Sequence, residues 1–192
     1  TITVTGTDGC GNSATVTYST RIDSTPPVLS GCPLVTLAVQ CVADVPGPAS
    51  VTAQDNCDGP VNVVFSESAS GPDCNKTIVR TWTATDTCGN AASCSQTITV
   101  KDTTPPSLTK GSIGACYLDV ASAEAAAKAA TTASDNCGGA VTLSATTAGD
   151  CSATITVTGT DGCGNSATVT YSTRIDSTPP VLSGCPPVTL AV

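Results

Sequence analysis

The stretch that decides the fold is residues 74–106, CNKTIVRTWTATDTCGNAASCSQTITVKDTTPP. Polar and apolar residues alternate at 80–85 and again at 96–100. A period of two in segments rich in Thr, Val and Ile is typical of strands with one buried face. The intervening Asp-Thr-Cys-Gly-Asn at 86–90 supplies Gly and Asn, which tolerate the positive φ of tight turns. These features predict a β-hairpin.

A second copy of this hairpin belongs to a long internal repeat. Residues 1–39 return at 154–192 with one change, Leu34 becoming Pro187, so the period is 153 residues (154 minus 1). Residues 154–160 and 168–171 again alternate around a Thr-Asp-Gly-Cys-Gly-Asn turn. Identity this close over 39 residues exceeds what a shared fold requires, so we expect the parent protein to carry further copies.

Thr-Pro-Pro marks the module boundaries, at Thr25, Thr104 and Thr178. Consecutive prolines fix φ and hold the preceding residue extended, which suits a stiff linker. The sequence therefore predicts four segments. Two are modules, at 28–106 and 107–180; residues 1–27 form the C-terminal part of one module and residues 181–192 begin the next.

Each module is expected to be an all-β sandwich. Short strands with regular turn signals predict a seven-stranded, immunoglobulin-like (Ig-like) architecture, repeated in tandem and rich in disulfides. Residues 121–130, ASAEAAAKAA, are the exception and predict one short Ala-rich helix in the second module. Trp82 is expected to anchor the core of its module, and Arg80 on the same face needs a partner or a route to solvent.

Composition excludes several functions. The 192 residues contain 12 Cys but no His and no Met, and the net charge is −8. Without His, the Ser-His-Asp and Cys-His nucleophiles and the usual zinc enzymes lose their central group, so we expect no enzyme. An acidic chain repels phosphate backbones, so nucleic acid is not an expected partner. No apolar run approaches the ~20 residues that span a bilayer.

The cysteines point to an oxidising compartment. No two of them form a CxxC pair, which disfavours zinc and iron–sulfur sites. Disulfides are then the working assumption, and they place the protein outside the cell or on its surface.

One pairing follows from the comparison of the two modules. Cys32 stands seven residues after Thr25, and Gly111 occupies the matching place after Thr104. Cys94 stands six residues after Cys88, and Val169 occupies the matching place after Cys163. A bonded pair should be lost together, so we predict a Cys32–Cys94 bond.

Sandwich topology suggests the remaining bonds, because the two landmark turns belong at the same end of each module. The predicted pairs are Cys57–Cys88, Cys137–Cys163, Cys41–Cys74 and Cys116–Cys151. Cys10 and Cys185 are left over, and we expect them to pair with cysteines of neighbouring copies. The alternative is that they are free thiols.

The segments VTAQDNC, residues 74–106 and TDGCGN resemble the hyalin-repeat (HYR-like) and bacterial Ig-like modules of secreted and cell-surface proteins. The resemblance covers nearly all of 28–106 and the second half of 107–180. It implies an extracellular, non-catalytic array of β-sandwiches and names no ligand.

Two kinds of site remain possible. Two Asp sets gather near the module ends and could supply oxygen ligands to Ca²⁺, and no other cofactor is expected. The sets are Asp23, Asp55, Asp86 and Asp102, Asp135, Asp161. The alternative is that these side chains only build turns. Asn75-Lys76-Thr77 is a glycosylation sequon, and Asn75 is its acceptor.

The favoured function is an extracellular structural repeat protein, in which modules join end to end into a stalk, fibre or surface filament. Its expected partners are copies of itself along the fibre and glycans. The alternative is an adhesin or carbohydrate-binding stalk with Ca²⁺-stiffened junctions.

Overall fold

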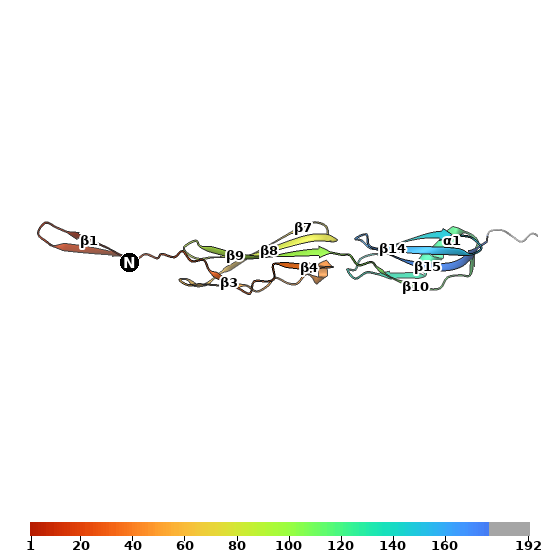
Figure 1. The fold of residues 1–192 in the computed structure, drawn as a ribbon, viewed down its shortest axis with the longest axis horizontal. Helices are drawn as coiled ribbons and strands as arrows, with labels where there is room; N and C mark the ends of the chain where they lie inside the picture. The colour runs from red at the N-terminus through yellow and green to blue at the C-terminus, as the bar shows by residue number, and fades with distance from the viewer. Residues whose placement is uncertain (177–192) are drawn as a thin grey trace, which may run out of the picture. The chain divides into compact units, whose positions relative to one another are not determined.

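A computed structural model describes residues 1–176, which divide into two compact units (Figure 1). The first unit contains Thr1–Val39 and Asp44–Lys101. The second contains Gln40–Ala43 and the described residues from Asp102 onward, 102–176. Among the described residues, no helix is long and apolar enough to cross a membrane.

The first unit is a sandwich of two sheets. The three-stranded sheet has the order β3 (Val28–Ser30), β5 (Thr52–Asp55), β6 (Gly59–Val61). The four-stranded sheet has the order β4 (Thr36–Val39), β9 (Ala91–Lys101), β8 (Asn75–Thr85), β7 (Val63–Ser70). β4 runs parallel to β9 and the other pairs are antiparallel. β8 and β9 are the hairpin that the alternation predicts.

The core of this unit lies on the inward face of β8 and β9. Ile78, Ile98 and Val100 form one buried cluster. Trp82 is 2% exposed, as expected of a core anchor. The centroids of its ring and of the Phe65 ring on β7 are 5.3 Å apart. Period-two burial along both strands matches the sequence pattern.

Arg80 lies on the same buried face and finds a partner. Its Nε donates to Glu67 Oε2 at 2.7 Å, and its Nη1 donates to the carbonyl of Pro46 at 2.8 Å. Arg80 is 5% exposed, so these two bonds satisfy a charge that burial would otherwise disfavour.

The second unit combines β strands with one helix. Its four-stranded sheet has the order β11 (Cys116–Tyr117), β15 (Ser166–Ile175), β14 (Ala153–Thr160), β13 (Thr142–Ala148). β10 (Ser107–Lys110) pairs with β12 (Thr131–Ser134). The fold class predicted from the sequence, all-β and Ig-like with disulfides, is confirmed.

The Ala-rich helix is α1 (Val120–Ala129). Asp119 caps it, since its Oδ1 accepts from the Ser122 N–H at 2.7 Å. Ala123 and Ala127 are fully buried against the unit's core. A helix this short is marginal alone, so packing on β13 and β14 stabilises it.

Residues 1–18 repeat the sequence 154–171 but are buried differently. They form a hairpin of β1 (Ile2–Thr7) and β2 (Ser13–Tyr18). Ile2 and Tyr18 are 54% and 56% exposed, whereas their counterparts Ile155 and Tyr171 are 0% and 1% exposed. The strands form from local sequence, and their burial depends on the elements that cover them.

The predicted Cys32–Cys94 bond is present. Cys94 lies on β9 and Cys32 follows β3, so the bond joins the two sheets of the first unit. In the second unit the Gly111 N–H donates to the Ala130 carbonyl at 2.8 Å, and a Cβ added at Gly111 would lie 2.5 Å from that oxygen. The matching site there has no room for a cysteine side chain.

Two predicted pairs are wrong because a different bond takes their cysteines. Cys41 bonds to Cys137, which excludes both Cys41–Cys74 and Cys137–Cys163. Cys41 is 6% exposed and lies in Gln40–Ala43, the segment that belongs to the second unit. Cys74 and Cys163 are each disulfide-bonded as well. The prediction failed because it confined each bond to one sequence module.

The pairs Cys57–Cys88 and Cys116–Cys151 are also wrong, because all four residues are exposed free thiols. The loops of Cys57 and Cys88 do lie together, since the Thr87 N–H donates to Asp58 Oδ2 at 2.7 Å. Adjacent loops do not guarantee the narrow Cα separation of about 4.4–6.8 Å that a disulfide requires. Cys10 is a free, exposed thiol, and Cys185 lies outside the described residues.

Candidate cation sites

Asp86 builds the turn of its hairpin. Its Oδ1 accepts from the N–H groups of Cys88 and Asn90, each at 2.8 Å, and its Oδ2 accepts from the Asn90 side chain at 2.7 Å. Gly89 completes the turn at φ +90°, a conformation that side chains disfavour. The same bonds recur at Asp161 in the second unit and at Asp8 in the N-terminal hairpin.

The turn bonds also set the acidity of these groups. Burial raises the pKa of Asp86, and the hydrogen bonds from Asn90, Cys88 and Gly89 outweigh it, so the pKa lies below its ordinary value. The same balance lowers the pKa of Asp161. Both side chains are therefore ionised acceptors at neutral pH, with their oxygens already committed to the turns.

This acidity gives a testable pH dependence. A carboxylate whose pKa is depressed on folding stabilises the protein above its ordinary pKa of about 4, and that contribution is lost as the pH falls through the lower folded value. We expect Asp86→Asn to remove this acid-dependent part of the first unit's unfolding free energy. The measurement is denaturant unfolding between pH 2 and 7, followed by the fluorescence of Trp82, the chain's one tryptophan.

Asp161→Asn is the matched control, because it makes the same change in the second unit, which does not contain Trp82. It should leave the Trp82-detected pH profile unchanged. An Asp86→Asn profile that keeps the full acid dependence would contradict the assignment.

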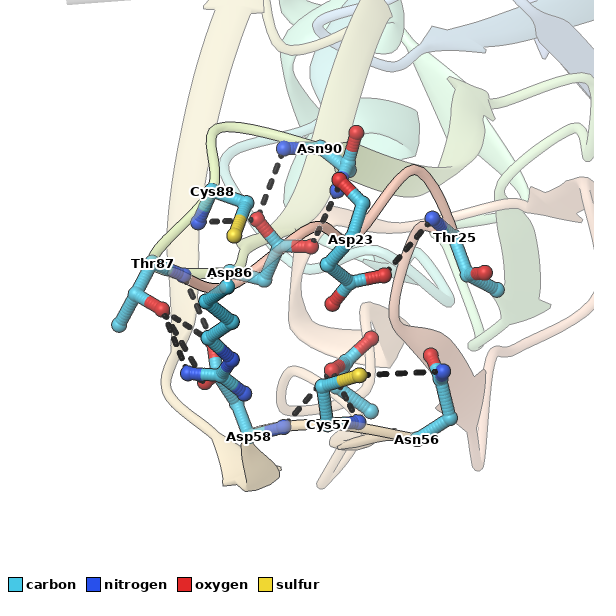
Figure 2. A network of polar contacts seen from close by, with 11 residues as sticks. Asp23, Thr25, Asn56, Cys57, Asp58, Asp86, Thr87, Cys88 and Asn90 are labelled. Carbon is cyan, nitrogen blue, oxygen red and sulfur yellow. Dashed lines mark hydrogen bonds and ion pairs between the residues drawn. The ribbon is translucent and has the colours of Figure 1, made fainter. Parts of the chain in front are cut away.

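Asp23 and Asp55 each commit one oxygen to a turn and leave the other unused. Figure 2 shows the bond from Thr25 to Asp23. Asp23 Oδ1 accepts from the Thr25 N–H at 3.0 Å. Asp55 Oδ1 accepts from the N–H groups of Cys57 and Asp58, each at 2.8 Å. Oδ2 of both residues is buried without a hydrogen-bond partner. Ligand atoms of Asp23, Asp55 and Cys57 all lie within 4.8 Å of one another.

The second unit repeats this arrangement with Asp102 and Asp135. Asp102 Oδ1 accepts from the Thr104 N–H at 3.0 Å, and Asp135 Oδ2 accepts from the Cys137 N–H at 2.9 Å. The remaining oxygens, Asp102 Oδ2 and Asp135 Oδ1, are buried without a partner. Ligand atoms of Asp102, Asp135 and Cys137 again lie within 4.8 Å of one another.

In each unit, the side-chain amide of an Asn in the hairpin turn bonds to the backbone of the Asp that precedes Thr-Pro-Pro, Asp23 or Asp102. Asn90 Nδ2 donates to the Asp23 carbonyl at 3.1 Å, and Asn165 Nδ2 donates to the Asp102 carbonyl at 3.3 Å. The turn Asp therefore positions the linker through Asn. The two predicted Asp sets therefore divide. Asp86 and Asp161 build turns, as the alternative interpretation expected. The carboxylates that come together are Asp23 with Asp55, and Asp102 with Asp135.

Arg21 interacts with the Cys57 thiol, but its charge is paired with Asp58. Arg21 forms an ion pair with Asp58, and its Nη1 donates to Thr87 Oγ1 at 3.1 Å. The Thr87 N–H, the Thr87 hydroxyl and Arg21 hold the pKa of Asp58 below its ordinary value. Desolvation raises the pKa of the Cys57 thiol, and the Asp23 carboxylate raises it further. Sequence reasoning missed Cys57 here because the expected sandwich topology suggested a disulfide with Cys88.

Comparison with known protein families finds a match to part of the chain. Residues 34–100 match the family model of the HYR-like domain with 4 cysteines. The resemblance expected from the sequence is thereby confirmed for this segment; the bacterial Ig-like resemblance stays a prediction. No curated protein matches the chain.

The HYR-like match covers residues of the first sequence module only. The matched span contains Cys94 and four other cysteines, at 41, 57, 74 and 88, and Cys94 bonds to Cys32 outside the span. The second unit carries four cysteines between 102 and 176, at 116, 137, 151 and 163. HYR-like domains are in general non-enzymatic and extracellular.

Proposed function

We propose that this chain is part of a non-catalytic extracellular structural protein, in which HYR-like modules join end to end into a stalk, fibre or surface filament. The observation that carries the proposal is the path of the chain. It enters the second unit at Gln40, returns to the first at Asp44, and enters the second again at Asp102. The Cys41–Cys137 bond anchors the short segment of the first passage.

This path suits a load-bearing array. The Cys41–Cys137 bond connects module 28–106 to module 107–180 covalently, in addition to the linker at residues 102–106. Tension along the chain can therefore be carried by the disulfide as well as by the linker. A bond that closes a loop of 96 residues also restricts the unfolded chain strongly, by about 4–5 kcal/mol on the loop-entropy model. Such a bond resists both unfolding and proteolysis.

The repeat extends this argument to the free thiols. Cys57 stands in Asp-Asn-Cys as Cys137 does, and Cys137 bonds to a cysteine contributed by the preceding sequence module. We infer that Cys57 bonds in the same way to the preceding copy and that Cys116 bonds to the following one. Exposed thiols have no stabilising role in an oxidising compartment, so partners in neighbouring copies account for the exposed free cysteines, including Cys10. The same proposal assigns Cys185 to a neighbouring copy.

The N-terminal hairpin supports the same proposal. Its apolar side chains are about half exposed, and the same side chains in residues 154–171 are covered by α1 and the strands of the second unit. The sequence equivalent of residues 107–153 would supply that cover. We propose that residues 1–27 complete a module of this kind.

The test is a chain in which residues 40–192 are appended after residue 192, which continues the repeat in register because 154–192 repeat 1–39. Peptide mapping of the unreduced protein should then find Cys116 linked to the second copy of Cys57. Cys116→Ser is the control and should leave that second Cys57 reactive to maleimide. A free Cys116 in the extended chain, or a Cys116–Cys151 bond, would contradict the array.

A glycan on Asn75 is also part of the proposal. Asn75 is exposed as the first residue of β8. The same peptide map, made on protein secreted from a glycosylating host, reports its occupancy.

A further inference from the structure

We propose that each unit holds one divalent cation of the Ca²⁺ type, bound by Asp23 and Asp55 in the first unit and by Asp102 and Asp135 in the second. The proposal does not depend on the array, since each site lies within one unit. It narrows the ligand sets expected from the sequence, because Asp86 and Asp161 use their oxygens in turns.

The unused oxygens are the first argument. Asp55 is 4% exposed and Asp102 is 7% exposed, and each has a buried Oδ2 without a hydrogen-bond partner. Burial of a carboxylate oxygen without a hydrogen-bond partner is strongly unfavourable, and native proteins rarely leave one in that state. Here the unpartnered oxygens occur in pairs, and the pair occurs at the matching place in both units. A bound cation would satisfy both members of each pair.

Distance is the second argument. Calcium binds oxygens at about 2.3–2.6 Å, so two oxygens on one ion can be separated by at most about 5 Å. The candidate ligand atoms in each site lie within 4.8 Å of one another. Two carboxylates held this close also repel one another, and a shared cation turns that repulsion into attraction.

Among the described residues, no basic side chain forms an ion pair with the four site carboxylates. Within residues 1–176, the three ion pairs involve Asp58, Asp73 and Glu67. Arg21 interacts with Cys57, and its charge is paired with Asp58. Within residues 1–176, no ion pair therefore offsets the charge of the four site carboxylates.

The ligand type selects the ion. Cys137 is in a disulfide, so its sulfur cannot act as a thiolate ligand. The donors common to both sites are then carboxylate oxygens, which suit Ca²⁺ or Mg²⁺ and not the softer metals that prefer sulfur. Calcium tolerates irregular geometry and completes its shell with carbonyls and water, which suits a site built from two turns.

The experiment is calorimetric titration of the whole, chelator-treated chain with CaCl₂. Two ions should bind per chain, with a Kd on the order of 10⁻⁴–10⁻³ M, the range of extracellular modules. Asp55→Asn and Asp102→Asn should each bind one ion, and the double variant none. Asn keeps an oxygen that can accept the turn hydrogen bonds, so the variants are expected to fold. Circular dichroism checks this, and Asp23→Asn and Asp135→Asn replace any variant that fails.

Asp44→Asn is the matched control, because it removes one negative charge from an exposed residue outside both sites. It should bind two ions as the parent does. Absence of binding at 10 mM CaCl₂, on the order of ten times the weakest expected Kd, would overturn the proposal. A stoichiometry that Asp55→Asn and Asp102→Asn leave at two would do so as well. A third contrary result is no binding together with a higher melting temperature for Asp55→Asn, which would show that a shared proton fills the site.

Discussion

Removing the Cys32–Cys94 bond with Cys32→Ser and Cys94→Ser together should lower the first unit's unfolding free energy by about 4 kcal/mol. The bond spans a sequence separation of 62 residues, and the loop-entropy model assigns about that much to such a closure. The bond also joins the two sheets of the unit, so its loss is expected to accelerate their separation. Denaturant unfolding followed by Trp82 fluorescence measures the change in this unit alone.

Cys10→Ser is the control, since Cys10 is an exposed free thiol on the N-terminal hairpin. It should leave the Trp82-detected midpoint in place. A double variant with the parent's midpoint would show that packing, and not the bond, holds the two sheets together.

Replacing the buried indole with Trp82→Ala should destabilise the first unit by about 3–5 kcal/mol, the range for large aromatic truncations in cores. Trp82 is 2% exposed, and its ring contacts Phe65. A protein with one Trp and one Phe has few side chains that can fill the cavity. Because the variant lacks the fluorophore, unfolding is followed by circular dichroism and calorimetry.

Val79→Ala on the same strand is the control, because Val79 is 38% exposed. Its effect should be a small fraction of that of Trp82→Ala. Trp82 lies opposite Cys94 in the β8–β9 register, so the two large effects should be non-additive when combined. Strict additivity would mean that the indole and the disulfide stabilise separate parts of the unit.

Local pattern was sufficient for the hairpins and the helix. The strand pairs β8–β9 and β14–β15 follow from alternating residues around an Asp-x-Cys-Gly-Asn turn, because both the pleat and the turn depend on near neighbours in sequence. Helix α1 follows from Ala content over one short segment. The burial of Trp82 follows from the same alternation.

Disulfide pairing shows where sequence reasoning stopped. The joint absence of two cysteines in the second module was enough to pair Cys32 with Cys94. The other pairs were assigned inside sequence modules, and the structure instead bonds Cys41 to Cys137 because Gln40–Ala43 lies in the second unit. A cue was available in the sequence: with six cysteines in module 28–106 and four in module 107–180, pairing between modules is as open as pairing within one.

For the candidate cation sites too, the sequence predicted part of the site and the fold decided the rest. The sequence brought the six Asp residues to notice, but it could not distinguish carboxylates that satisfy a turn from those with an oxygen to spare. That distinction depends on which N–H groups face each oxygen after folding. Asp86 receives bonds on both oxygens, whereas Asp55 receives them on one.

The sequence alone determined the repeat, the strand and helix types, and the disulfide-rich Ig-like class, because periodicity, turn chemistry and cysteine count act over short distances along the chain. Tertiary structure alone decided that Cys41 bonds to Cys137, which carboxylate oxygens stay unpartnered, and why Ile2 is exposed while Ile155 is buried. These properties depend on contacts between residues far apart in sequence, and identical segments acquire different surroundings when different elements pack against them.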